Sequence, residues 1–153
     1  MLAKLKQLLD QNGVQYTPIV HHTAYTAQEV AAAEHVPGRE HAKVTIIKAG
    51  QEFMMAVMPA QKKIDFTKLA AVLGGKQVRL AEEREFSDIF PGCEPGAMPP
   101  FGHLFSLPVV VDVDLEKDEN IAFQAGTHVE SVRMKYVDFK RLEKPQIADF
   151  TAK

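Results

Sequence analysis

One segment, residues 91–102 (PGCEPGAMPPFG), restricts the fold of this chain more than any other. It holds four of the nine prolines and three of the nine glycines. Proline fixes φ and lacks an N–H, so the segment is stiff but cannot be a regular helix or strand. Gly96 is free to adopt a positive φ. We expect a rigid loop whose N–H and C=O groups at Gly96, Ala97 and Met98 suit a carbonyl or developing oxyanion, although a loop that only covers a sheet would show the same pattern.

The sequence before this loop predicts helices and strands in alternation. Apolar residues at helical spacing, capping residues and Gly or Pro stops predict helices at 2–12, from Thr26 to about His35, after Asp65, and at 82–90. Runs of β-forming residues predict an edge strand at 14–20, which contains Pro18, a hairpin of 44–47 with 53–58, and a strand at 76–80. The hairpin is almost continuously apolar, so we expect both of its faces to be covered.

After the loop, the pattern predicts strands at 109–111, 121–123 and 131–134, and a last helix at 136–142. The tail from Lys144 is expected to be loosely ordered. A hairpin mixed with helices favours an α/β fold of the α+β type, with a mixed sheet and not a doubly wound parallel one. A length of 153 residues without repeat or linker predicts a single domain over 1–153.

Composition excludes several classes of protein. Hydrophobic residues make up 46% and charged residues 25% of the chain, as in folded globular proteins. The formal net charge of −2 provides no overall basic field to attract nucleic acid, although a local basic patch remains possible. No window approaches the run of about 20 apolar residues that a membrane span needs, and the first residues lack an apolar signal core. We therefore expect a cytoplasmic protein without a membrane or DNA partner.

Motifs for metals, cofactors and nucleophiles are missing. Cys93 is the only cysteine, which excludes an intramolecular disulfide and a four-cysteine zinc site. Its neighbours supply no cation or helix N-terminus to lower the thiol pKa, so we interpret it as an ordinary loop residue. The six histidines form no His-Glu-x-x-His pair, and the chain has no Gly-rich phosphate loop or nucleophile elbow. We expect no metal and no cofactor; a metal hydrolase that uses the histidines is a weaker alternative.

Lysine at position 43 is a candidate binding residue because it opens an apolar strand. Such a lysine either extends its ammonium group to solvent at the strand edge or is placed to bind phosphate or carboxylate. Further basic residues could form a local rim or be merely solvated: Lys48, Lys62, Lys63, Lys76 and Arg79.

Several short motifs occur in one order: Ala42-Lys43, Asp65 with Leu69, Gly-x-x-x-Pro-Phe-Gly at 96–102, and Ala125-Gly126. In this order they resemble the YbaK/ProX family of trans-editing aminoacyl-tRNA deacylases, which is related to the editing domain of bacterial prolyl-tRNA synthetase. The resemblance runs from about His22 to Leu142. It implies a mixed, partly barrel-like sheet with flanking helices. It also implies hydrolysis of the ester that joins a wrong amino acid to the tRNA 3′ end, in which the tRNA acceptor end is the partner.

Residue roles follow from the same resemblance. Lys43 would hold a phosphate near the terminal adenosine, and the backbone of Gly96 to Pro100 would position the aminoacyl carbonyl and the ribose hydroxyls. The catalytic candidates are thus Lys43, Gly96, Ala97, Met98 and Pro100. The substrate-binding candidates are His22, Tyr25, Thr45, Pro99, Phe101, Gly126 and His128. A synthetase such as prolyl-tRNA synthetase is a further candidate partner.

Two positions differ from the usual pattern of that family. Val44 follows the lysine where Thr, Ser or Asn is frequent, and Ala125-Gly126-Thr127-His128 differs from the twin-glycine pattern of the cysteine-editing members.

The expected substrate is tRNA that carries a small amino acid, such as Ala, Cys, Ser or Thr. The alternative is a module that binds tRNA ends or a synthetase without catalysing hydrolysis.

Overall fold

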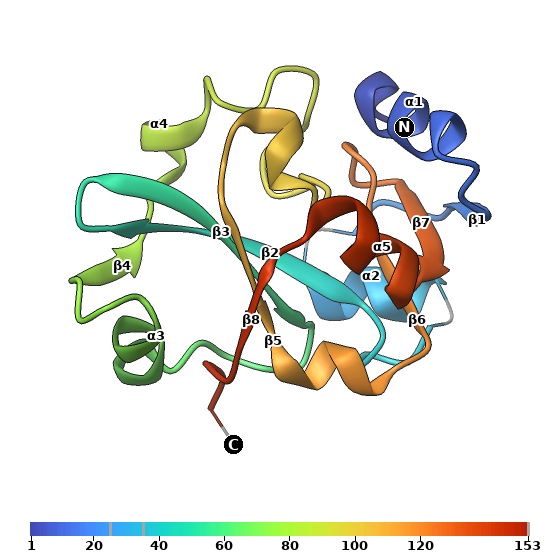
Figure 1. Ribbon diagram of the computed structural model, residues 1–153. Helices are drawn as coiled ribbons and strands as arrows, with labels where there is room; N and C mark the ends of the chain where they lie inside the picture. The colour runs from blue at the N-terminus through green and yellow to red at the C-terminus, as the bar shows by residue number, and fades with distance from the viewer. Residues whose placement is uncertain (25, 35, 153) are drawn as a thin grey trace.

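The computed structural model describes residues 1–24, 26–34 and 36–152. Within them the strands form two sheets (Figure 1). One sheet is antiparallel, in the order β1-β7-β6, with β1 at Tyr16–Val20, β7 at Glu130–Lys135 and β6 at Asn120–Gln124. The other is mixed, in the order β4-β2-β3-β5-β8, with β4 at Val78–Leu80, β2 at Ala42–Ala49, β3 at Glu52–Pro59, β5 at Val109–Asp112 and β8 at Gln146–Ala148. The expected mixed sheet is confirmed, as is the position of the strand containing Pro18 at a sheet edge.

Five α-helices are described: α1 at Ala3–Gln11, α2 at Ala27–Glu34, α3 at Phe66–Val72, α4 at Glu83–Phe86 and α5 at Tyr136–Glu143. Two 3₁₀ helices lie at Gly102–Phe105 and Val113–Lys117. The expected capping residues do begin their helices: Asp65 accepts hydrogen bonds from the N–H groups of Thr67 and Lys68, and Thr26 Oγ1 accepts one from Glu29 N–H. Helix α4 is shorter than the prediction of 82–90. No helix in these residues is long and apolar enough to cross a bilayer.

The β2–β3 hairpin separates two hydrophobic cores. Its strands pair over their full length, from Ala42 opposite Pro59 to Ala49 opposite Glu52, and Gly50 takes φ +61° in the turn. Because side chains alternate between faces, Ile46 and Met55 enter the larger core, whereas Ile47 enters a second core beneath α3. The expectation that both faces are covered is confirmed.

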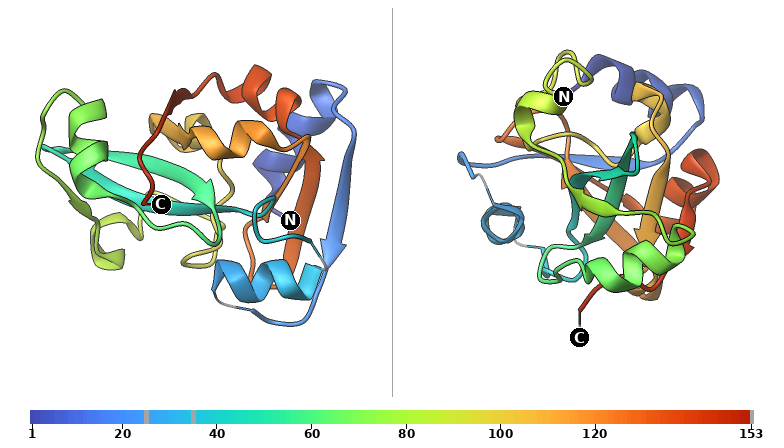
Figure 2. Two further views of the ribbon diagram at one scale, coloured as in Figure 1. Left: turned by 90° about the horizontal axis from the view of Figure 1, so that it is seen from below. Right: turned by 90° about the vertical axis from the view of Figure 1, so that its left-hand side faces the viewer.

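Around the antiparallel sheet, the larger core contains residues from α1, α5, β6 and β7, and the buried side chains of α2 pack elsewhere. Figure 2 shows α2 and α5 on opposite sides of the sheets. Met98 and Phe101 of the loop at residues 91–102 are part of the larger core, so the loop is packed against that core and not against the one beneath α3.

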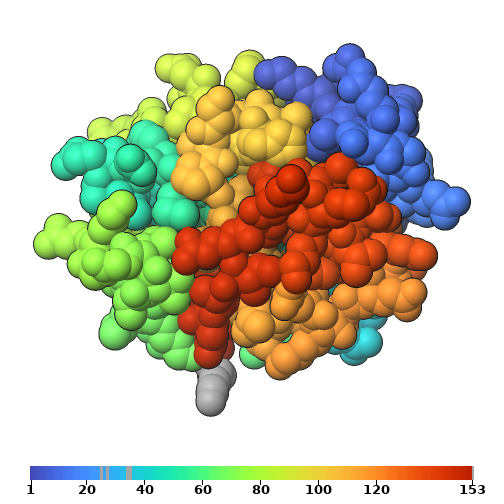
Figure 3. Space-filling model, viewed as in Figure 1, coloured from blue at the N-terminus to red at the C-terminus, as the bar shows by residue number. Residues whose placement is uncertain are grey.

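The prediction of a loosely ordered tail is wrong. Residues 146–148 form β8, which pairs in parallel with β5, and Phe150 is completely buried in the core beneath α3. The C-terminal residues pack across the front of the molecule against earlier segments (Figure 3). A three-residue parallel strand carries no hairpin or periodic signal of its own, because its partner lies more than thirty positions earlier in the chain.

The burial of Phe150 yields a test of this tail. Phe150→Ala should lower the free energy of unfolding by about 3–5 kcal/mol, because it removes a large buried ring and leaves a cavity. Gln146→Ala changes an exposed side chain of the same tail and should alter stability by less than about 0.5 kcal/mol. Urea denaturation of both variants measures the difference. Equal stabilities would show that the tail does not contribute to the core.

Candidate functional site

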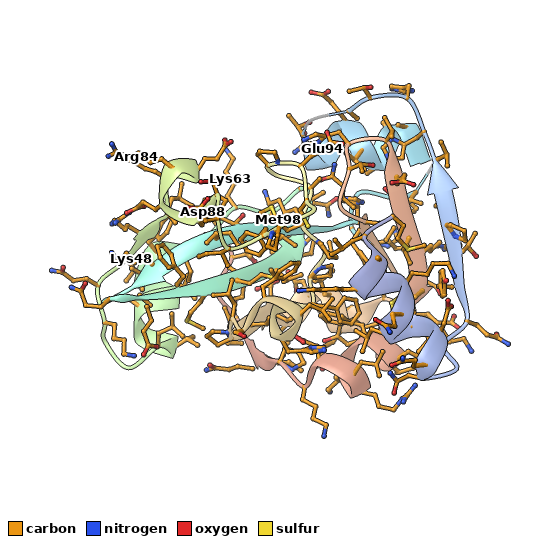
Figure 4. All side chains as sticks on the ribbon, turned by 90° about the horizontal axis from the view of Figure 1, so that it is seen from above. Lys48, Lys63, Arg84, Asp88, Glu94 and Met98 are labelled. Carbon is orange, nitrogen blue, oxygen red and sulfur yellow. The ribbon has the colours of Figure 1, made fainter. Side chains whose placement is uncertain are left out.

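Backbone hydrogen bonds fix the proline-rich loop to the turn between β6 and β7. Glu94 N–H donates to Gly126 O at 2.8 Å, and Gly126 N–H donates to Ala97 O at 2.9 Å. Inside the loop, Ala97 N–H donates to Glu94 O at 3.0 Å. The carboxylate of Glu94, which Figure 4 labels, also accepts a hydrogen bond from His128 N–H at 3.3 Å. The loop is therefore held at both ends of a four-residue turn by one short segment.

Glycine is required at two positions of this contact. Gly96 has φ +82° and Gly126 has φ +106°, in the region that other residues rarely adopt. A side chain at Gly96 would meet His128 Cε1 at 3.7 Å, which is an ordinary contact distance. A side chain at Gly126 would meet Leu2 at 3.2 Å, which is tighter. Gly126 is thus enclosed by the N-terminal segment, and Gly96 is exposed.

Two N–H groups of the loop have no hydrogen-bond partner among the described residues, one on exposed Gly96 and one on buried Met98. Both backbone polar groups of Ala97 are engaged in holding the loop, and the two prolines at 99 and 100 have no N–H. Within the described part of the chain, no hydrogen bond uses the N–H of Gly96 or Met98. Of the three residues expected to present their backbone, Gly96 and Met98 therefore offer donors and Ala97 does not.

The residues that follow these donors anchor the loop. Pro99, Pro100 and Phe101 are buried. The ring of Phe101 packs edge-on against Phe123 and Phe139, with centroids 5.7 and 5.2 Å apart. Such aromatic pairs contribute about 0.5–1.5 kcal/mol beyond their burial. The structure thus places these three candidates in the buried part that anchors the loop to the core, whereas Gly96 is exposed.

His128 links the loop to β6 through its side chain. Its Nε2 lies 2.8 Å from Pro95 O, and Gln124 Nε2 lies 3.3 Å from its Nδ1. A carbonyl only accepts, so Nε2 carries the proton, and Nδ1 accepts from the Gln124 amide. Both ring nitrogens are thus engaged, and the imidazole supports the loop. Gln124 was not a candidate, because a glutamine inside a strand gives no motif of its own.

Lysine 43 and Thr45 lie on a different part of the surface. They point to one face of β2, and with Lys63 and Phe66 they line an open cavity of about 290 Å³. Lys43 is half-buried, and this burial, followed by repulsion from the Lys63 ammonium, lowers its pKa below the ordinary lysine value. Val44, on the opposite face, packs against the larger core.

A backbone bridge connects the strands that carry the two parts of the candidate site, at the point where the two sheets separate. His41 on the β2 side forms a parallel bridge with Ala122 of β6, and Ala122 N–H donates to Glu40 O at 2.9 Å. Beyond this bridge β2 and β6 belong to different sheets. Lys43 and Gln124 each lie two residues further, about 7 Å along their strands. No hydrogen bond among the described residues joins Lys43 or Thr45 to the loop, so a ligand would have to connect them.

Other sequence candidates fall outside this arrangement. His22 is exposed, whereas neighbouring His21 is buried and bonds Ser131 Oγ through Nε2 at 3.0 Å. Tyr25 lies outside the described residues. The expected basic residues do not form one rim. Lys48 and Arg79 line a separate cavity of about 350 Å³, and Arg79 is paired with Glu85.

Nucleophile and metal interpretations gain no support from the geometry. Burial raises the pKa of the Cys93 thiol to about 11, with slight opposition from Lys4, so the thiol stays protonated at neutral pH. Among the residues described, no three His, Cys, Asp or Glu side chains are grouped to hold a metal ion.

Comparison with known proteins identifies the family. The model of the aminoacyl-tRNA editing domain matches residues 21–142, which agrees with the extent of the motif resemblance. The multifunctional Ser/Thr-tRNA deacylase ProXp-y of Escherichia coli (strain K12) is 29% identical, over 96% of this chain and 90% of its own length.

A proline–tRNA ligase of Thermosipho africanus is 34% identical over 87 residues, which are 57% of this chain and 15% of the ligase. A crystal structure provisionally assigned as a trans-editing enzyme for prolyl-tRNA synthetase has the same fold, with a TM-score of 0.82 and 22% identity, covering 98% of this chain and 96% of the other. The chain belongs to the aminoacyl-tRNA editing domain family, in its YbaK/ProX group.

Proposed function

We propose that this chain hydrolyses the ester between a wrongly attached small amino acid and the 3′ end of tRNA, without a metal ion. The observation that carries the proposal is the loop at Gly96 to Met98, in a chain that belongs to the editing family. This loop is held in place by backbone hydrogen bonds, and two of its N–H groups have no partner among the described residues. A developing oxyanion is stabilised by such backbone donors.

The chemistry needs few protein groups because an aminoacyl ester is already activated. Water adds to the carbonyl carbon, the bond to the ribose oxygen breaks, and that oxygen takes a proton, which leaves free amino acid and tRNA. In our proposal the Gly96 and Met98 N–H groups donate to the carbonyl oxygen as its negative charge develops. The neighbouring ribose hydroxyl orients the water or accepts its proton, since the imidazole of His128 is engaged in holding the loop.

Lysine 43 is assigned the phosphate next to the terminal adenosine. Its ammonium is half-buried, and no carboxylate among the described residues pairs with it, so an anion would relieve the cost of its burial. Thr45 supports the assignment, because it projects from the same face of β2 into the same cavity. Val44 points away into the core, so Thr45 supplies the hydroxyl that the family often places directly after the lysine.

The substrates proposed are tRNAs that carry serine or threonine first, and alanine or cysteine second. The Escherichia coli relative is named for Ser/Thr-tRNA deacylation, and it matches almost the whole chain. Discrimination by pocket size is modest, about 1–3 kcal/mol for one methylene, so several small amino acids should be accepted. Prolyl-tRNA synthetase is a candidate second partner, because part of a proline–tRNA ligase is similar to this chain.

A deacylation panel tests the reaction. The protein is incubated with tRNA charged with serine, threonine, alanine or cysteine, and with phenylalanyl-tRNA as the large control, in buffer that contains a chelator. We expect release of the small amino acids well above the spontaneous rate and no acceleration for phenylalanine. Tight binding of every charged tRNA without turnover would instead identify a binding module, and loss of activity with the chelator would identify a metal hydrolase.

A matched pair of glycine variants tests the loop. Gly96→Ala places a side chain at φ +82°, and Gly75→Ala does so at φ +81° beyond helix α3, where nothing lies within 4 Å. Both should cost about 1–2 kcal/mol of stability. Only Gly96→Ala should reduce kcat, by about 100-fold, because it displaces the two donors. A Gly96→Ala enzyme with the kcat of Gly75→Ala would contradict the role of this loop.

A further inference from the structure

Two ammonium groups face the cavity beside β2 without a compensating acid. Lys43 comes from β2. Lys63, which Figure 4 labels, lies on the segment that joins β3 to α3. The Lys63 charge is close enough to lower the pKa of Lys43. In the described part of the chain, neither side chain forms an ion pair.

Neighbouring lysines behave differently. Lys62 pairs with Asp114 at 3.6 Å, and Lys68 pairs with Asp149 at 3.3 Å. Of these four lysines, the two without a carboxylate partner are the two that line the cavity; elsewhere in the described residues Lys4, Lys48, Lys76, Lys135 and Lys144 also form no ion pair. Like charges that repel one another at a partly buried site are stabilised by a bound anion. The charge pattern therefore selects an anionic ligand over a neutral or cationic one.

The other residues that line the cavity are mostly apolar, and two of them are exposed to solvent. Phe66 is 38% exposed and Leu80 is 54% exposed, and they are two of the five large apolar side chains exposed in the described residues. Phe66 is the first residue of α3, and its position is fixed by the Asp65 cap. An exposed aromatic ring beside unpaired cations is the combination that binds single-stranded nucleic acid, because the ring stacks on a base and the cations bind phosphate.

We infer that this cavity binds the nucleotide that precedes the aminoacylated adenosine. The phosphate that links this nucleotide to the adenosine lies between Lys43 and Lys63, and its base lies against Phe66. The volume of about 290 Å³ is at the lower end of small-ligand pockets, which suits one nucleotide. The inference rests on the proposed function, since it extends the contact of Lys43 with the tRNA end by two further residues. Lys63 and Phe66 are then positioning residues that act on tRNA affinity and not on the chemical step.

The inference is tested with four variants and two measurements. Lys63→Met and Phe66→Ala are compared with Lys63→Arg and Phe66→Trp, which keep the charge and the aromatic face. KM and kcat are measured with seryl-tRNA. The Kd for a single-stranded oligonucleotide that ends in CCA is measured at salt concentrations from about 50 to 300 mM. Phosphate contacts weaken over roughly 50–200 mM, so this series covers the change.

We expect Lys63→Met to raise KM and Kd about tenfold and to reduce the salt slope by roughly 0.7, the value for one phosphate contact on a single strand. Phe66→Ala should raise Kd about 5- to 100-fold, the loss of one stacked base, without changing the salt slope. In both variants kcat should stay unchanged, and the conservative variants should restore binding. Lys135→Met, which removes an exposed lysine from β7, is the control for net charge and should change neither constant.

The outcomes separate the two proposals. If the native protein deacylates seryl-tRNA but Lys63→Met and Phe66→Ala retain its KM, Kd and salt slope, this inference is overturned and the proposed function stands. If the native protein binds the CCA oligonucleotide through these residues but hydrolyses no charged tRNA, the cavity is supported and the proposed function fails. If Lys135→Met has the same effect as Lys63→Met, Lys63 acts only through the net charge of the protein, and the inference is overturned.

Discussion

The hydrogen bonds between the proline-rich loop and the β6–β7 turn are the contact on which the candidate site depends. Gly126 both accepts from Glu94 and donates to Ala97, so the two segments are held in one register although about thirty residues separate them in the chain. The His128 ring adds a second connection through Pro95. Without these contacts the stiff loop would keep its local shape, but its free N–H groups would have no defined direction relative to the sheets.

Much of the fold could be predicted because its signals are local. Helical spacing, the Asp65 and Thr26 caps and the apolar hairpin each lie within a few residues, and all are found in the structure. The rigid loop was also foreseeable, since proline and glycine restrict φ regardless of their surroundings. By contrast, β8 is a short parallel strand whose stability comes from β5 and from the burial of Phe150, and nothing nearby in the sequence signals either.

The candidate site was predictable to a smaller extent. The motif resemblance selects Lys43, Gly96, Gly126 and His128, and the structure places the last three where the loop contacts the β6–β7 turn. It does not reveal that Ala97 uses both of its backbone groups to hold the loop, or that Gln124 orients His128. Those facts depend on pairings between distant segments. Lys63 belonged to a general basic rim until the structure placed it, with Phe66, in the cavity of Lys43.

The strict alternation of side chains along β2 also limits how the gene for such a protein can change. Lys43 and Thr45 face the cavity and Val44 faces the core, so a substitution at position 44 alters packing while the polar pair stays in place. A single-residue deletion between Lys43 and the hairpin turn would have the opposite effect, because it would shift the register and turn the lysine inward. Substitutions at position 44 therefore leave Lys43 and Thr45 facing the cavity, whereas an insertion or deletion within the strand does not.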